Sequence, residues 1–119
     1  PLATLINGLV GTPLLVDIDA HLIEQVLVNI IKNSAESIEN NGEITITTVA
    51  NPAPSITIAD NGKGISNEVA NKLFTPFFST KPNGEGLGLI FIREVLMKHK
   101  CRFSLRTFDD KITRFTISF

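Results

Sequence analysis

Residues 55–65 read SITIADNGKGI and carry the clearest structural signal in the chain. The first six residues alternate in period two, which predicts a strand with one buried face. Asp60 closes this strand, and Gly62 and Gly64 follow it. A carboxylate at a strand end can accept a hydrogen bond from a ligand, and glycines let the backbone approach closely. An ordinary turn is the competing interpretation. A calcium loop is disfavoured because the later ligands of an EF-hand pattern are missing.

Upstream, an amphipathic helix is predicted over residues 20–38, with Asp19 as its N-cap. Its apolar positions recur at helical spacing: Ile23, Leu27, Ile30, Ile31 and Ile38. A polar stripe follows the spacing i, i+4, i+8 and i+11 on the same helix: Gln25, Asn29, Asn33 and Glu36. A solvated face is the plain explanation, but asparagine is a poor helix former. Two asparagines four residues apart present oxygens in one direction, which suits Mg²⁺.

Downstream, a second glycine-rich stretch at residues 84–89 (GEGLGL) opens a predicted helix over residues 87–99. This helix is apolar around most of its circumference, so we expect it to be buried. Glycines at a helix N-terminus expose backbone amides where the dipole favours phosphate. The spacing matches neither a Rossmann fingerprint nor a P-loop. Between the loops, residues 73–81 (LFTPFFSTK) form either a hydrophobic staple or the hinge of a mobile lid, with Lys81 near phosphate.

The remaining segments predict an α/β fold. We expect a strand and turn in residues 1–13, strands at 14–17, 43–49, 102–107 and 112–119, and a short helix at 67–74. Strand pairs with interspersed helices give a two-layer sandwich, in which about three helices cover one face of a mixed, mostly antiparallel sheet. Residues 1–119 are expected to form a single domain.

Composition excludes several classes of partner. The formal net charge of −1 argues against nucleic acid, and no apolar run is long enough to span a membrane. The single cysteine, Cys101, cannot form an internal disulfide, so we expect a core position in a reducing compartment, the cytoplasm. The chain begins at Pro1 and its only methionine is Met97, so we expect it to be part of a longer protein that is either free or anchored in a membrane.

In their order and spacing, these motifs resemble those of the Bergerat-fold (GHKL) ATPases, which include histidine kinases, gyrase B subunits, heat-shock ATPases and mismatch-repair proteins. Asp19 to Asn33 is similar to the N box of that family, and Asp60 to Gly64 is similar to its G1 box. Residues 73–78 resemble the F box, and residues 84–89 resemble the G2 box. The resemblance runs from about residue 14 to the end of the chain, and four motifs in register are highly specific.

The resemblance implies ATP and Mg²⁺ as cofactors. Asp60 would accept the adenine amino group, and Thr113 would support Asp60 through water. Asn33 would hold Mg²⁺, with Asn29 as a second polar contact. The short lid, residues 79–86, is most similar to that of nitrogen-regulation-type sensor kinases. It implies Lys81 as a phosphate contact.

By the same resemblance, the catalytic residues are Asn29, Asn33 and Lys81. The implied nucleotide contacts are Asn29, Asn33, Asp60, Gly62, Gly64, Ile65, Phe74, Lys81, Gly84, Gly86, Leu87, Gly88 and Thr113. The chain departs from the family pattern at three places. Glu85 replaces a small hydroxyl residue and puts a carboxylate near phosphate, and Ser34 replaces a common alanine. Lys100 and Cys101 replace the glycines that the family carries after the helix predicted at residues 87–99, so a left-handed helix cap is not expected there.

Hydrolysing members of the family carry a glutamate as general base where this chain has Asn29, and a neutral amide cannot take a proton from water. The sequence therefore favours phosphoryl transfer to a group other than water over ATP hydrolysis. We expect the acceptor to be a histidine on dimerisation helices outside this chain, because neither His21 nor His99 lies in the family's His-Glu-x-x-x-Pro pattern. A homodimeric parent and a response regulator receiver domain are the implied partners.

Two alternatives remain open at this stage. One is a serine kinase of the anti-sigma type, which would lack upstream acceptor helices. The other is a degenerate nucleotide-binding module with a regulatory role, which Glu85 favours because a carboxylate repels phosphate.

Overall fold

A computed structural model describes residues 4–8, 18–50, 52–72 and 87–119. In chain order the elements are β1 (Thr4–Gly8), α1 (Ala20–Ser37), β2 (Glu43–Val49), β3 (Ser55–Asp60), α2 (Asn67–Ala70), α3 (Leu87–Lys98), β4 (Arg102–Thr107) and β5 (Thr113–Ser118). Each follows its predicted segment closely, although α2 is shorter than expected. The strand predicted at residues 14–17 lies outside the described residues.

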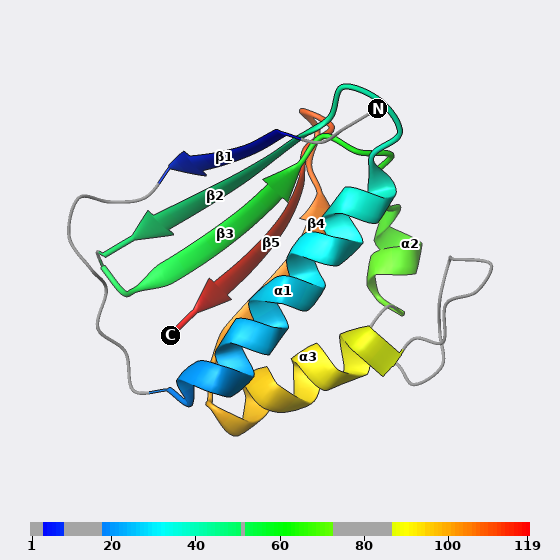
Figure 1. The fold of residues 1–119 in the computed structure, drawn as a ribbon. Helices are drawn as coiled ribbons and strands as arrows, with labels where there is room; N and C mark the ends of the chain where they lie inside the picture. Colours follow the sequence, from blue (N-terminus) through cyan, green and yellow to red (C-terminus); the bar gives the residue numbers. More distant parts are fainter. Residues whose placement is uncertain (1–3, 9–17, 51, 73–86) are drawn as a thin grey trace.

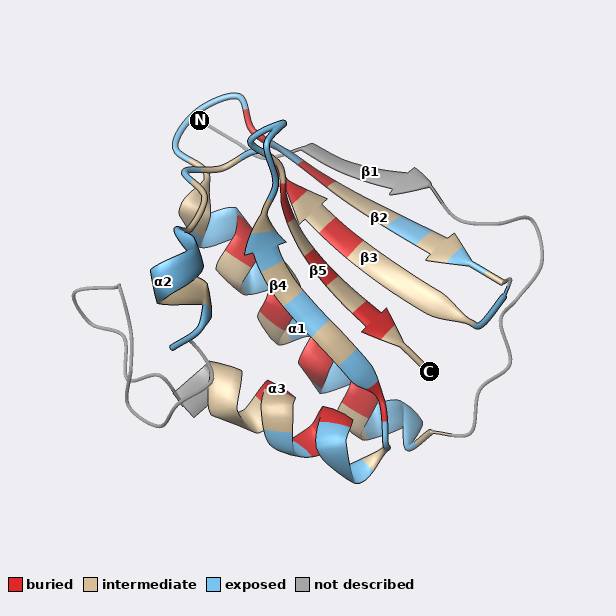
Figure 2. Ribbon diagram, turned by 180° about the vertical axis from the view of Figure 1, so that it is seen from behind, coloured by how far each residue is buried: buried red, intermediate tan, exposed pale blue. Residues whose placement is uncertain are grey.

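The strands form one five-stranded sheet in the order β1-β2-β3-β5-β4. β1 runs parallel to β2, and the other neighbours are antiparallel. Helices lie on one face of this sheet, with α1 crossing it diagonally and α3 beside α1 (Figure 1). Seen from behind, β5 alternates buried with half-buried residues, and β4 alternates exposed with half-buried ones (Figure 2). The predicted two-layer sandwich with a mixed, mostly antiparallel sheet is confirmed.

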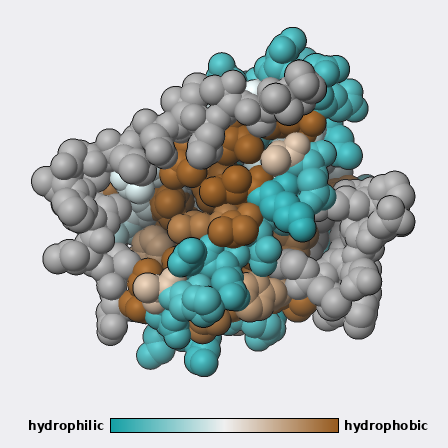
Figure 3. All heavy atoms as spheres, viewed as in Figure 1, coloured by the Kyte–Doolittle hydropathy of each residue, from teal (hydrophilic) through white to brown (hydrophobic). Residues whose placement is uncertain are grey.

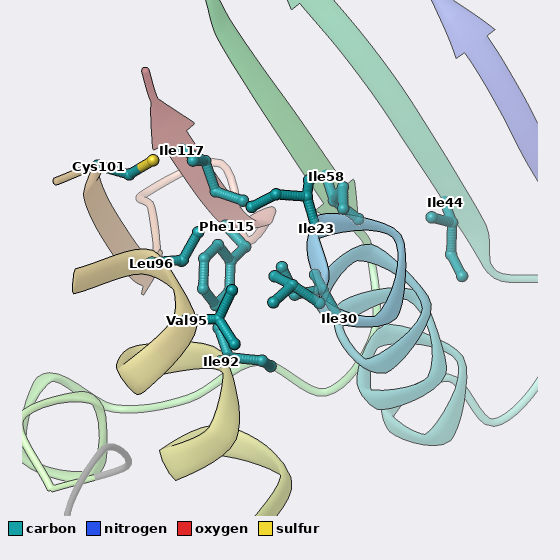
Figure 4. Close-up of a cluster of buried hydrophobic side chains, with 11 residues drawn as sticks. Ile23, Ile30, Ile44, Ile58, Ile92, Val95, Leu96, Cys101, Phe115 and Ile117 are labelled. Atoms are coloured by element: carbon teal, nitrogen blue, oxygen red, sulfur yellow. The ribbon is translucent and has the colours of Figure 1, made fainter. Parts of the chain in front are cut away.

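The core fills the space between α1, α3 and the sheet (Figure 4). α1 contributes Ile23, Val26 and Ile30, which follow the helical period and face the strands. The sheet contributes every second residue of its strands: Ile44, Ile58, Phe115 and Ile117. Burying an aliphatic side chain of this size stabilises the fold by about 1.5–3 kcal/mol. The two periods, 3.6 in the helix and 2 in the strands, therefore bring their apolar faces together.

Helix α3 is buried on one face only. Ile92 and Leu96 are fully buried, whereas Met97 is 52% exposed. We expected burial around most of this helix, but its described residues are buried on one side and exposed on the other. Cys101 follows the helix and is buried, as predicted, and desolvation raises the pKa of its thiol. The thiol thus stays protonated and acts as a small apolar group.

The end of α3 corrects a second expectation. Lys100 adopts a left-handed conformation with φ 58°, and its amide donates to the carbonyl oxygen of Met97 at 3.0 Å. The next amide, of Cys101, donates to the carbonyl oxygen of Leu96 at 2.9 Å. These two bonds define a Schellman cap. The cap forms without glycine because two backbone hydrogen bonds hold lysine in this conformation.

On the face that bears the helices, apolar atoms gather beside α1 (Figure 3). Ile46 and Ile56, on the strands that α1 leaves partly uncovered, are half-buried there. No helix among the described residues is both long enough and apolar enough to cross a membrane.

Candidate functional site

The candidate site lies where β3 ends beside the C-terminal end of α1 (Figure 1). α1 begins at its predicted N-cap, where the Asp19 carboxylate accepts the amide of Leu22 at 3.2 Å. It ends at Ser37 because Ile38 adopts extended backbone angles. Gly42 then packs against Ile38 so closely that a Cβ atom would lie within 2.0 Å of its side chain. This contact fixes the chain between α1 and β2.

Asp60 is the last residue of β3 and is only 5% exposed. Its Oδ1 accepts a hydrogen bond from the amide of Gly62 at 2.9 Å and lies 3.1 Å from the hydroxyl of Ser37. Both contacts that the described residues make with this carboxylate end on Oδ1. Oδ2 therefore keeps its capacity to accept a hydrogen bond from a ligand.

The loop after Asp60 is pressed against the end of α1. A Cβ atom on Gly62 would lie 2.2 Å from the Ser37 hydroxyl oxygen and 2.7 Å from its carbonyl oxygen, so only glycine fits. The amide of Lys63 donates to that same carbonyl at 3.0 Å. The close approach at Gly62 is therefore to the helix end, whereas the sequence predicted a close approach to a ligand.

On its other side the loop is held by β4. Gly64 has φ +76°, a conformation that favours glycine, and it packs against the Thr107 side chain. The amide of Ile65 donates to Thr107 Oγ1 at 2.8 Å, and this oxygen lies 2.7 Å from Thr113 Oγ1. Thr113, 7% exposed, is the cross-strand partner of Asp60. A chain of polar contacts thus runs from the loop to the strand beside Asp60.

The polar stripe on α1 leads to this acid. Gln25 is exposed and Asn29 and Asn33 are half-buried. One further step of four residues reaches Ser37, the residue that contacts Asp60. Residues spaced by four share a helix face, so Asn29 and Asn33 lie on the face that ends at the carboxylate. Glu36, the fourth residue of the predicted stripe, is exposed.

The structure therefore brings together Asp60, Gly62, Gly64, Ile65 and Thr113, and aligns Asn29 and Asn33 with them. Gly88 and Leu87 lie in the first turn of α3. The other predicted site residues, Phe74, Lys81, Gly84 and Gly86, lie outside the described residues, as do Glu85 and the lid at residues 79–86.

Sequence reasoning missed Ser37 and Thr107. Ser37 was detectable, because Gln25, Asn29, Asn33 and Ser37 repeat every four residues. Thr107 carried no such signal. Its contacts with Ile65 and Thr113 depend on the sheet order, in which β4 pairs with β5 and not with β3.

Within the described residues, no group of three or more His, Cys, Asp or Glu side chains could hold a metal ion. A cation here would depend on amide oxygens, and Mg²⁺ is commonly bound through few protein ligands, with waters and substrate phosphates completing its shell. Asn33, half-buried on the stripe, fits that role. The arrangement can thus bind a ligand that offers a hydrogen-bond donor to Asp60 and an anionic group farther along α1.

Residues 18–119 match a family model described as histidine kinase-, DNA gyrase B-, and HSP90-like ATPase. Sporulation kinase A of Bacillus subtilis is 34% identical over 102 residues, which cover 85% of this chain and 17% of that protein. The C4-dicarboxylate transport sensor protein DctS of Rhodobacter capsulatus is 41% identical over 103 residues, 82% of this chain and 15% of that protein. The chain thus spans less than a fifth of these two relatives.

Among solved structures, the catalytic domain of histidine kinase ThkA in a nucleotide-free form superposes with a TM-score of 0.86 at 27% identity. The superposition covers 98% of this chain and 78% of that one. The similarity therefore includes β1 and the helices.

Proposed function

The chain belongs to the family of histidine kinase-, DNA gyrase B- and HSP90-like ATPases, and we propose that it is the catalytic domain of a two-component histidine kinase. In this proposal the domain binds Mg²⁺-ATP and donates the γ-phosphate to a histidine on dimerisation helices of its parent protein. The observation that carries the proposal is the buried Asp60 at the end of β3, with one oxygen held and the other available.

Adenine recognition follows from that carboxylate. The adenine amino group is a donor, and Oδ2 of Asp60 is the acceptor that the loop leaves available to it. Gly62 and Gly64 let the loop pack closely against α1 and β4, and the backbone held there would contact the base. Ile65, half-buried next to Gly64, would add apolar contact with the base. Thr113, across the strand pair from Asp60, would support the acid through water.

The phosphates would extend along α1 towards Asn33 and Asn29. Asn33 would hold Mg²⁺, which neutralises charge on the phosphates and orients them for in-line transfer. Lys81 and the glycines Gly84, Gly86 and Gly88 would contact the phosphates from the lid and the start of α3, with Phe74 and Leu87 lining the site. The domain supplies positioning and charge neutralisation, and the incoming imidazole is itself the nucleophile.

The choice of a kinase over a hydrolase rests on Asn29. Its amide cannot act as a general base, so attacking water would not be activated at that position. A relative named as a sporulation kinase supports the same choice. A response regulator receiver domain is the proposed next acceptor of the phosphate.

Mixing this chain with the upstream helices of its own parent protein and labelled ATP tests the proposal. We expect acid-labile, base-stable label on the helix fragment, lost when the helix histidine is replaced by glutamine. Label that survives this replacement, or that resists acid as a phosphoserine does, would contradict histidine transfer and favour the serine-kinase alternative.

A further inference from the structure

Ser37, the last residue of α1, reaches the acid that the proposed function uses for adenine recognition. Its hydroxyl oxygen lies 3.1 Å from Asp60 Oδ1 and 2.8 Å from the carbonyl oxygen of Ser34. A serine hydroxyl has one proton and can donate it to one of these oxygens at a time. An ionised carboxylate is the stronger acceptor, so the proton is favoured on the Asp60 side.

The position of this hydroxyl is fixed by the loop. Lys63 donates its amide to the Ser37 carbonyl at 3.0 Å, and Gly62 packs directly on Ser37. The same loop donates the Gly62 amide to Asp60 Oδ1 at 2.9 Å. Two donors, one from a helix and one from the loop, therefore converge on a single carboxylate oxygen.

From these contacts we propose that Ser37 is a positioning residue for base recognition. It acts through Asp60, by holding Oδ1 so that Oδ2 stays directed at the 6-amino group of the purine. The inference rests on the proposed function, because it assumes that Asp60 recognises adenine. Beyond the proposed function, the inference assigns the preference for a 6-aminopurine to the C-terminal end of α1. The helix that carries Asn33 would then also position the acid that recognises the base.

A purely local role is the alternative. If the Ser37 hydroxyl donates its proton to the Ser34 carbonyl instead, it only satisfies a carbonyl oxygen in the last turn of α1. Removing it would then lower stability, and it would weaken binding of every purine nucleotide to the same extent or leave binding unchanged.

Calorimetric affinities for two ligands separate these roles: ADP, and purine riboside 5′-diphosphate, in which hydrogen replaces the 6-amino group. We expect the wild-type chain to prefer ADP, and Ser37→Ala to lower that preference about three- to tenfold, the size of one modest hydrogen bond. Ser34→Ala is the matched control. It removes a buried hydroxyl from the same helix and leaves the backbone carbonyl, so the preference should be unchanged.

Asp60→Asn distinguishes failure of the inference from failure of the proposed function. If this variant keeps the full preference for ADP, or if the wild type has none, Asp60 does not read the amino group and the proposed function loses its main support. If Asp60→Asn removes the preference but Ser37→Ala keeps it, the proposed adenine site stands and the role of Ser37 is wrong. Thermal unfolding of each variant confirms that the affinities belong to folded protein.

Discussion

At the scale of residues, the site is built from small polar groups, each of which has one task. Asp60 is buried and paired on one oxygen, while Thr107 and Ser37 hold its loop from two sides. Short hydroxyl side chains suit this work because they lose little rotamer freedom on burial. Asp60 and the glycines were predictable, since a carboxylate followed by glycines is a local pattern. Thr107 was not, because its role depends on contacts 42 residues apart in sequence.

Asn33 carries a prediction at this scale. If it is the Mg²⁺ ligand, Asn33→Ala should largely remove the Mg²⁺ enhancement of ATP binding and reduce phosphotransfer strongly. Adenosine binding should change little, because the base contacts are made by Asp60 and its loop, one helical turn beyond Asn33. Titration of ATP with and without Mg²⁺ measures this. Gln25→Ala, on the exposed part of the same stripe, is the control that should keep the wild-type Mg²⁺ response. An equal enhancement in wild type and Asn33→Ala would exclude Asn33 as a ligand.

At the scale of elements, periodicity predicted where the helices and strands lie in the sequence. The way each helix is capped depends on backbone contacts that periodicity does not report. The C-terminal turn of α1 packs against the loop after β3, which donates the Lys63 amide to the Ser37 carbonyl. The cap of α3 forms with Lys100, where the departure from the family pattern led us to expect no such cap.

His99 joins two elements: its Nε2 lies 3.0 Å from the amide nitrogen of Asp19, and its Nδ1 lies 2.8 Å from the carbonyl oxygen of Val95. Accepting an amide at Nε2 requires the neutral ring protonated on Nδ1.

The Schellman cap gives a stability prediction. A non-glycine residue in the left-handed region is strained, so Lys100→Gly should relieve that strain and stabilise the domain by about 0.5–1 kcal/mol, net of glycine's greater unfolded-state entropy. Thermal or urea unfolding measures the gain. Lys98→Gly, two residues earlier and still helical, is the matched control and should cost roughly 1 kcal/mol. A loss of stability in Lys100→Gly would mean that the lysine side chain makes a contribution the cap geometry does not explain.

The hairpin between β4 and β5 gives a pH prediction. The Arg114 side chain donates to Asp110 at 2.7 Å, and this bond, with the Ile112 amide, lowers the pKa of Asp110. Since the folded pKa is below the unfolded one, the contribution is present above the unfolded value of about 3.9 and is lost as pH falls through the folded value. Asp110→Asn should therefore lower the Tm slightly at pH 7 and not at all at pH 2.

High salt should reduce the difference at pH 7, because the pair is exposed and screened. The neighbouring exposed Asp109 provides the control, since Asp109→Asn should show no comparable dependence on pH. A Tm difference for Asp110→Asn that persists undiminished at pH 2 would show that the turn geometry, and not the ion pair, is responsible.

At the scale of the whole molecule, sequence reasoning reached the layer arrangement but not the strand order. Alternating strands and amphipathic helices predict two layers, and the β2–β3 and β4–β5 pairs follow from short connections. The insertion of β5 between β3 and β4 does not, because pairing β3 with β5 joins residues far apart in the chain. That order places Thr113 opposite Asp60. No local sequence pattern pointed to Thr113, and only the family resemblance named it as a candidate site residue.

The last prediction concerns the isolated domain. Given Mg²⁺ and ATP but no partner, this chain should release phosphate only at a trace rate and should not label itself. Asn29 offers no base for water. His99 uses both ring nitrogens in backbone contacts with Asp19 and Val95, so it has no free lone pair to attack phosphorus. His21 lies in the first turn of α1, sixteen residues before Ser37 and so roughly 24 Å along the helix from the base site. Phosphate release and acid-labile label are measured together, and addition of the parent's helices is the positive control. Steady release without those helices, or label that His21→Gln or His99→Gln removes, would overturn the assignment of a kinase that acts on a histidine outside this chain.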